Sequence, residues 1–158
     1  MTVSGYRILD EPSPGALARF LVNPFWPLLS LMLGGAWIAW PWFAFNAFAL
    51  GSATRRRELA LIGGALVSSA LVYFLAEPLA LSSGLGERIY PYLRIVLYVA
   101  KVAFAYFLHV RQAYSLGLYE HFHGAPKNGA IVAIAAAFVD NQVDELLRSN
   151  ALLWTVLS

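Results

Sequence analysis

The feature that most constrains this chain is a stretch of residues, 25–50, that contains no charged side chain. A helix needs about 20 predominantly apolar residues to cross the hydrocarbon core of a bilayer, so this stretch is long enough to span with a tilt or a bend. Pro41 lies in its interior, where a proline removes a backbone hydrogen bond and kinks a helix. We therefore expect one kinked span over 25–50. The alternative is a break at Pro41 into two short pieces, which predicts a re-entrant hairpin.

The composition of the whole chain is that of a membrane protein. Of its 158 residues, 59% are hydrophobic and 13% are charged, whereas a soluble domain is about 45–50% apolar and about 25% charged. The mean hydropathy is +0.62. So few charges cannot cover a soluble core with a polar surface. The absence of cysteine excludes disulfides and thiolate chemistry. A net charge of only +2, without a basic face interleaved with aromatic residues, argues against a nucleic-acid partner.

Two further spans are expected, over 59–79 and 91–110. The first of them ends at Glu77-Pro78, because the residue before a proline tends to leave the helical conformation. The second begins near Pro91 and continues to His123, so residues 111–123 form a helical extension beyond the membrane. A loop over 82–88 separates these two helices.

The two ends of the chain are more polar than its middle. Residues 1–23 are predicted to be a polar segment with a short interfacial helix that Ser13 caps. Residues 129–157 are apolar at first, then polar, with an apolar stripe at helical spacing in which Asn150 is the single polar member. We expect a fourth helix here, either spanning or amphipathic. The predicted fold is thus all-α, an integral membrane helical bundle of three to four transmembrane helices with interfacial segments, in a single domain over 1–158.

The distribution of arginine predicts the orientation. Arg55, Arg56 and Arg57 precede the second span, and Arg111 and Lys127 fall on the same side if the second and third spans alternate in direction. Because positively charged loops stay in the cytoplasm, we expect the 55–57 loop and the 111–128 loop to be cytoplasmic in a bacterial-type inner membrane. The N-terminus then lies outside if 25–50 spans once, and inside if it re-enters.

Lys101 is the most informative single residue. A lysine at the centre of a bilayer costs about 2.5–3.5 kcal/mol, so it should face protein or water and have a partner. Arg94 lies seven residues earlier on the same helical face. If the last helix runs antiparallel to the third, Asp140 is level with Lys101 and Asp144 is level with Arg94. The hypothesis is that Lys101–Asp140 and Arg94–Asp144 form buried ion pairs, although Asp144 and Arg148 could also pair locally.

Small residues at four-residue spacing favour close packing of membrane helices. The candidate packing residues are Gly34, Gly35, Gly64 and Ser68. A metal site at His109, Glu120, His121 and His123 is weakly indicated, because two histidines separated by one residue do not share a helical face.

No catalytic motif appears in the sequence, and we expect no cofactor, no metal and no enzymatic activity. The first functional hypothesis is a non-enzymatic subunit or oligomeric scaffold of a membrane complex, whose partners are the lipid bilayer and copies of itself or other membrane subunits. The alternative is an oligomeric channel or transporter protomer for an ion or small solute. In that case Arg94, Lys101, Asp140 and Asp144 would line a polar axis.

Overall fold

The computed structural model describes residues 15–76, 78, 86–122 and 124–157. Within these residues the chain is helical and contains no strands, which confirms the all-α class. The elements are η1 (Ala16–Phe20), α1 (Phe25–Gly34), α2 (Ala36–Ala49), α3 (Arg55–Leu71), the π-helical η2 (Val72–Ala76), α5 (Gly86–His121), α6 (Ala130–Arg148) and α7 (Ala151–Leu157). The predicted cap at Ser13, the loop residues 82–85 and His123 lie outside the described residues.

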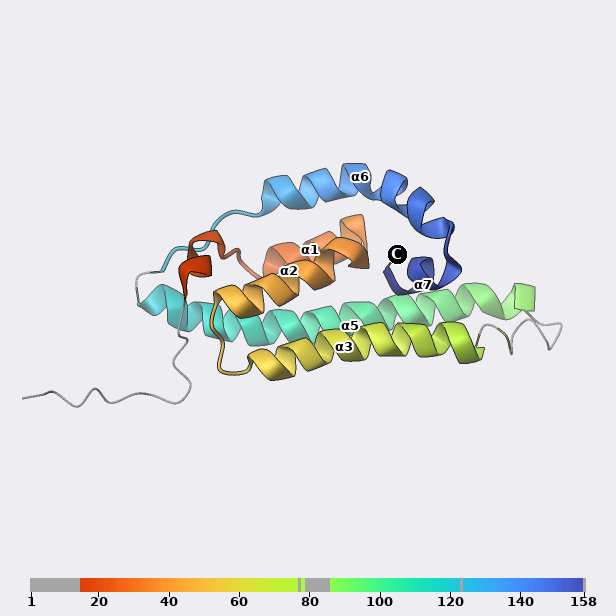
Figure 1. Ribbon diagram of the computed structural model, residues 1–158, viewed down its shortest axis with the longest axis horizontal. Coiled ribbons are helices and arrows are strands. Elements are labelled where there is room, and N and C mark those ends of the chain that lie inside the picture. The colour runs from red at the N-terminus through yellow and green to blue at the C-terminus, as the bar shows by residue number, and fades with distance from the viewer. Residues whose placement is uncertain (1–14, 77, 79–85, 123, 158) are drawn as a thin grey trace, which may run out of the picture.

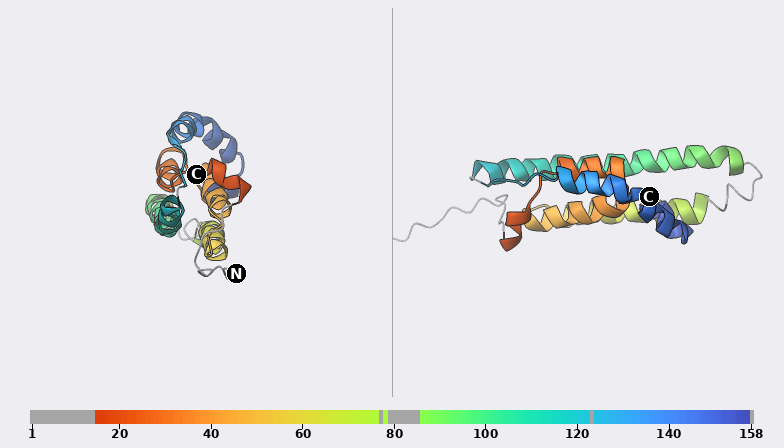
Figure 2. Two further views of the ribbon diagram at one scale, coloured as in Figure 1. Left: turned by 90° about the vertical axis from the view of Figure 1, so that its left-hand side faces the viewer. Right: turned by 90° about the horizontal axis from the view of Figure 1, so that it is seen from above.

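The helices form an elongated bundle of three layers (Figures 1 and 2). The long helices α3 and α5 lie side by side as one outer layer, α1 and α2 form the middle layer, and α6 is the other outer layer. The hairpin of α1 and α2 covers only part of the length of α3 and α5. Beyond its turn, α7 folds back beneath α6 and occupies the rest of the middle layer (Figure 1).

The uncharged stretch 25–50 folds as a hairpin of two helices. α1 has 10 residues and α2 has 14, and they run in opposite directions from a turn at Gly35 (Figure 1). Gly35 has φ 79°, a conformation that glycine adopts without the steric cost of a side chain. The expectation of one kinked span is therefore wrong. The chain forms two short antiparallel helices, as the alternative predicts, but the break lies at Gly35, whereas Pro41 is inside α2.

Two helices are long and apolar enough to cross a membrane, by length and composition: Arg55–Leu75 and Pro91–His121. Only 22% of the apolar window of each is buried inside the protein. α5 begins at Gly86, earlier than expected, so residues 86–88 are helical and not part of a loop. Pro91 lies inside this helix, where a proline removes one backbone hydrogen bond, and the helix continues on both sides of it. At the other end, the Gly124 N–H donates to the Tyr119 carbonyl at 3.0 Å, as in a Schellman C-cap.

The last segment is two helices and not one. α6 ends at Arg148 and α7 begins at Ala151. The Asn150 side-chain oxygen accepts a hydrogen bond from the Leu153 N–H at 3.2 Å, which is the bond that an asparagine N-cap makes. The continuous helix expected over 129–157 is therefore wrong. The one polar residue in its apolar stripe is the point at which the chain turns.

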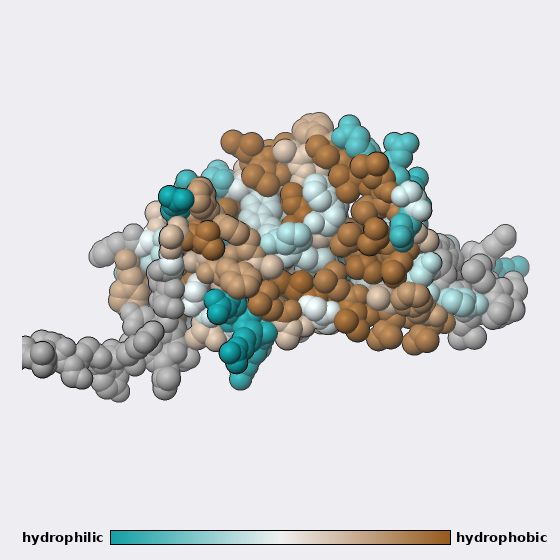
Figure 3. Space-filling model, in the orientation of Figure 1, coloured by the Kyte–Doolittle hydropathy of each residue, from teal (hydrophilic) through white to brown (hydrophobic). Residues whose placement is uncertain are grey.

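The packed interior lies between the hairpin, α3 and α5. Its largest cluster consists of Leu31, Ala36, Ala39, Trp40, Phe43, Ile62, Ala65, Ala105 and Leu108. A smaller cluster near the loops contains Leu21, Ala49, Leu50 and Leu116. Much of the outer surface is also apolar: in Figure 3 hydrophobic residues cover most of the face in view, and hydrophilic residues gather at the start of α3 and around the turn between α6 and α7.

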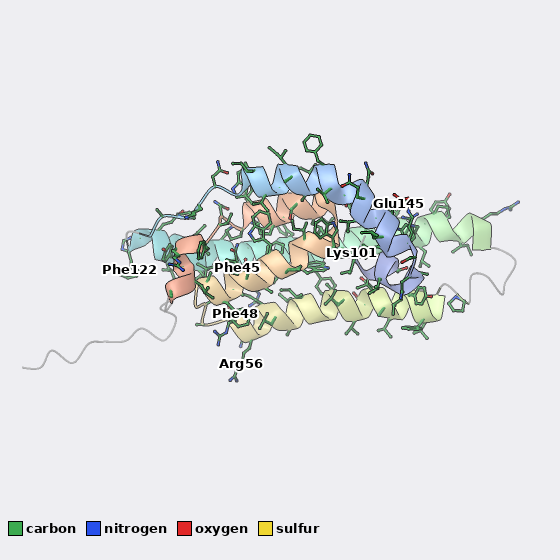
Figure 4. All side chains as sticks on the ribbon, turned by 45° about the horizontal axis from the view of Figure 1, so that its top comes forward. Phe45, Phe48, Arg56, Lys101, Phe122 and Glu145 are labelled. Carbon is green, nitrogen blue, oxygen red and sulfur yellow. The ribbon has the colours of Figure 1, made fainter. Side chains whose placement is uncertain are left out.

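The two ends of the bundle differ in charge. η1, the start of α3 and the end of α5 lie at one end (Figure 1), which carries the exposed Arg19, Arg55, Arg56, Arg57 and Lys127. Arg56 points away from the bundle, as Figure 4 shows. The opposite end has the turn between α6 and α7, with Glu145 and Arg148 exposed. We call these the arginine end and the turn end.

Candidate functional site

Polar side chains line the inward face of α5. Lys101 is 4% exposed, and Gln112 and Ser115 are also buried. Arg94 lies on the same face, two turns before Lys101, and is more exposed. These groups belong to two separate clusters, one where α5 meets α7 and one near the arginine end.

Lys101 holds the C-terminal end of α7. Its Nζ donates a hydrogen bond to the Thr155 carbonyl at 2.9 Å. Thr155 is in the last turn of α7, where carbonyls have no partner within the helix and carry its partial negative charge. An ammonium group at this position therefore stabilises the end of α7. Figure 4 shows Lys101 inside the bundle.

Asp140 lies against the hairpin turn, near the C-terminal end of α7. Its Oδ1 would be 3.3 Å from a Cβ atom built on Gly35. Among the ion pairs between described residues there is none that joins Lys101 to Asp140. Depth matching predicts that Asp140 is level with Lys101 and pairs with it. In the structure the Lys101 ammonium donates to a backbone carbonyl of α7, because α7 occupies this part of the middle layer.

Arg94 and Asp144 are connected through a tryptophan. The Arg94 guanidinium carbon is 4.1 Å from the centroid of the Trp154 ring. The indole Nε1 of Trp154 donates to Asp144 Oδ1 at 2.5 Å. Asp144 Oδ2 accepts hydrogen bonds from Arg148 at 2.7 Å and 3.0 Å, which confirms the local pair within α6. We call Arg94, Lys101, Asp144, Trp154 and Thr155 the α7 junction, because they fasten α7 to α5 and α6.

A cavity of about 520 Å³ lies beside the α7 junction. Its walls come from η2, from the first half of α5 and from α7, at the turn end of the bundle. Most of the wall is aliphatic or aromatic, and the charged side chains are two cations. The lining residues are Val72, Tyr73, Pro91, Leu93, Arg94, Ile95, Leu97, Tyr98, Lys101, Trp154 and Thr155.

The second cluster surrounds a carboxylate that the sequence interpretation missed. Glu58 is fully buried in the first turn of α3. Its Oε1 accepts hydrogen bonds from the hydroxyls of Ser52 at 2.7 Å and Thr54 at 2.8 Å, and its Oε2 accepts one from Gln112 at 3.0 Å. The positive end of the α3 dipole also favours a carboxylate there. We call Ser52, Thr54, Glu58, Gln112 and Ser115 the Glu58 cluster, since Ser115 lies 3.4 Å from Ser52.

The signal that could have revealed Glu58 was weak. Glu58 follows three arginines, so it resembles an exposed charge of the same turn. Gln112, however, lies on the α5 face that also carries Arg94 and Lys101, and a buried glutamine on this face needs partners from a neighbouring helix.

The predicted packing residues have different roles. A Cβ built on Gly34 would be 2.9 Å from the Cβ of Ala136, so α1 and α6 approach closely there. A Cβ built on Gly64 would be 3.6 Å from the Phe104 ring, an ordinary contact with α5. Gly35 makes the hairpin turn, and the Ser68 hydroxyl donates to the Ala65 carbonyl of its own helix.

The weakly indicated metal residues are not brought together. His109 is half-buried, with its ring 6.4 Å from that of Tyr106, while Glu120 and His121 are exposed. Within 15–76, 78, 86–122 and 124–157 no group of three or more histidine or carboxylate residues is placed to hold a metal ion.

Comparisons with known proteins give no relative from which to infer a role. A scan against protein-family models, a search of curated proteins and a search of solved structures each found no match to this chain.

Proposed function

We propose that this chain is a non-enzymatic subunit of a membrane assembly, in which α3 and α5 cross the bilayer and the hairpin of α1 and α2 re-enters from the arginine end. The observation that carries the proposal is the orientation of α6, which turns small residues toward the protein and large apolar residues outward. This helix buries the small Ala133 and Ala136, while Ile131 is 82% exposed and Phe138 is 78% exposed. In water such a face would be costly, whereas lipid or a neighbouring subunit covers it favourably.

The surface of α5 supports the same conclusion. Large apolar side chains are exposed along most of its length, on the faces that do not contact α3 or the hairpin. They are Ile95, Val96, Val99, Tyr106, Phe107 and Val110. A core helix of a soluble protein would bury these side chains, since each contributes about 1.5–3 kcal/mol on transfer from water.

The charge difference between the two ends supports one orientation. The arginine end carries exposed Arg55, Arg56 and Arg57, so we place it in the cytoplasm of a bacterial-type inner membrane. Because the hairpin returns the chain to the end where it started (Figure 1), η1 lies on the cytoplasmic side as well. The turn end then faces the outside.

A scaffold is favoured over a channel by how the polar side chains are used. The Lys101 ammonium is bonded to α7, Asp144 is bonded to Arg148 and Trp154, and Asp140 lies against the hairpin turn. The Lys101 and Trp154 contacts join one helix to another, and the Asp144–Arg148 pair lies within α6, so all of them are made inside a single copy. An axis lined by all four predicted residues would require them to face a common space, and only Arg94 and Lys101 line the cavity. The outward faces of α5 and α6 are the surfaces that we assign to a second copy or another membrane subunit.

The membrane part of the proposal can be tested by fractionation and labelling. The chain should remain in the pellet when membranes are extracted with alkaline carbonate. Because it has no cysteine, single cysteines are clean topology probes. Ala16→Cys and Arg56→Cys should react with an impermeant maleimide only after the cells are permeabilised, and Glu145→Cys should react in intact cells. Release by carbonate would overturn membrane insertion, and opposite sidedness of Ala16 and Arg56 would overturn the re-entrant hairpin.

The subunit part is tested by the mass of the purified protein in nanodiscs and by reconstitution. A discrete oligomer or a co-purifying membrane protein is expected from light scattering. Replacement of Lys101 with Met should lower thermal stability or assembly without a change in ion flux through proteoliposomes. A flux that depends on Lys101 in an intact oligomer would favour the channel alternative.

A further inference from the structure

The cavity beside α7 has the size and the walls of a ligand site. Its volume of about 520 Å³ lies within the range of about 300–1,000 Å³ that is typical of small-molecule pockets. Apolar and aromatic side chains form most of its wall, and the described lining contains two cations and no carboxylate. A ligand that fits this wall is largely apolar and carries a negative charge.

Arg94 is positioned to bind that negative charge. Its guanidinium stacks on the Trp154 ring at 4.1 Å, so one face of the group is occupied and its orientation is restrained. This stacking contact with Trp154 uses one face of the planar guanidinium. The N–H groups at the edge of the guanidinium remain available to the cavity, and their fork geometry matches phosphate or carboxylate oxygens.

The depth of these residues indicates how an amphiphile would lie. Arg94 is within one turn of Pro91, where the apolar stretch of α5 begins, so in the proposed orientation it is near the outer headgroup region. Lys101 is seven residues further along, about 10 Å deeper at 1.5 Å per residue. Leu97 and Tyr98 lie between them on the cavity wall. Because the Lys101 ammonium holds the Thr155 carbonyl, the acidic head is assigned to Arg94, with the acyl chain against the wall below it.

We infer that the cavity between η2, α5 and α7 binds an acidic amphiphile, an acyl chain with a phosphate or carboxylate head, through Arg94. This inference rests on the proposed membrane location. The bound amphiphile would contact α7 and α5 together, so it would strengthen the α7 junction.

The test is lipid binding by the purified, delipidated protein in a neutral detergent, followed by native mass spectrometry. The probes are phosphatidylglycerol, phosphatidylcholine with the same acyl chains, and palmitate. Wild type should bind one molecule of an acidic probe in preference to phosphatidylcholine. Arg94→Gln should bind it roughly tenfold more weakly or worse, since a hydrogen bond to a charged group is lost. Arg88→Gln is the matched control, because Arg88 is exposed on the same helix and does not line the cavity.

Each outcome has a defined meaning. Preference for phosphatidylglycerol identifies a phospholipid, and preference for palmitate identifies a free fatty acid; either supports the inference. Equal binding of phosphatidylcholine, or unchanged binding by Arg94→Gln with wild-type helicity and melting temperature, would overturn it. Arg94→Lys keeps the charge without the fork and should bind with intermediate strength, which guards against a folding defect in the glutamine variant. Carbonate extraction reports on the membrane location independently, so the two proposals can fail separately.

Discussion

The side-chain amide of Gln112 donates a hydrogen bond to the buried carboxylate of Glu58 across 3.0 Å. The same nitrogen also donates to the Phe43 carbonyl at 2.8 Å. One amide group thus connects α5 to both α3 and α2 near the arginine end. At the other end of the same α5 face, Lys101 holds α7. Gln112 and Lys101 therefore each hold α5 to neighbouring helices, and each contact leads to a prediction.

Removal of the Glu58 carboxylate should destabilise the bundle. Glu58→Ala removes the shared acceptor of the Ser52 and Thr54 hydroxyls and one of the two acceptors of the Gln112 amide, and a buried unsatisfied group costs about 1–3 kcal/mol. We expect a clear fall in the melting temperature in detergent, measured by circular dichroism. Glu58→Gln should lose less, since its amide oxygen still accepts. Glu120→Ala, at an exposed carboxylate of α5, is the control. Equal melting of Glu58→Ala and wild type would show that the cluster does not contribute to stability.

Gly34 and Gly63 should respond in opposite ways to alanine. A Cβ on Gly34 would be 2.9 Å from the Ala136 Cβ, whereas nothing lies within 4 Å of a Cβ on Gly63. Gly34→Ala should therefore destabilise the bundle by about 1–3 kcal/mol through overpacking. Gly63→Ala should be neutral or stabilising by about 0.5–1 kcal/mol, because glycine is unfavourable inside a helix. Thermal melting is the measurement, and Ala136→Gly should rescue Gly34→Ala only in part, because the backbone carbon of residue 136 would still be 3.1 Å from the new Cβ. Equal melting of Gly34→Ala and wild type would mean that α1 and α6 do not pack closely at this point.

Replacement of Lys101 with Met should loosen α7. The methionine fills similar space but donates no hydrogen bond to the Thr155 carbonyl, and the end of α7 loses its compensating charge. Hydrogen exchange measured by mass spectrometry should be faster in residues 151–157 and unchanged in α3. The exposed Arg88→Met on the same helix serves as the matched control. Unchanged exchange in α7 would contradict the fastening role of Lys101.

Replacement of Asn150 with Ala should fray the start of α7. The variant loses the acceptor for the Leu153 N–H, and loss of an N-cap costs about 0.5–2 kcal/mol. Faster exchange is expected at 151–154, while α6 should be unaffected. Asn150→Asp retains a capping oxygen and should behave as wild type. If residues 151–154 exchange at the wild-type rate in Asn150→Ala as well, the turn between α6 and α7 does not depend on this cap.

The sequence was sufficient to predict the helical class, the charge of the arginine end and the need of Lys101 for a protein partner. Each follows from a local quantity, such as hydropathy, loop charge or the cost of a buried cation. A hairpin was the alternative prediction, but the position of its turn was not predicted, because Gly34-Gly35 fits a helix-packing pattern as well as it fits a turn, and a proline nearby was the stronger apparent signal for a break. Only the φ of 79° at Gly35 separates the two.

The partners of the charged residues could not be predicted for a related reason. Depth matching assumes that helices continue through the bundle, but α6 ends at Arg148 and α7 reverses direction. The carbonyl that receives the Lys101 ammonium is therefore a backbone group of Thr155, which carries no side-chain signal in the sequence. The acceptor of Gln112 was hidden similarly, since Glu58 shares its turn with three arginines.

The close approach of Gly34 to Ala136 has a consequence for biosynthesis. Gly34 leaves the ribosome early, and the alanine that covers it is synthesised only after α3 and α5 have been made. During translation the hairpin must therefore wait with the side of α1 that packs on α6 uncovered. Completion of the bundle is a late event that requires synthesis of residues 130–157, and a nascent chain arrested before α6 should expose the face of α1 that Ala136 covers.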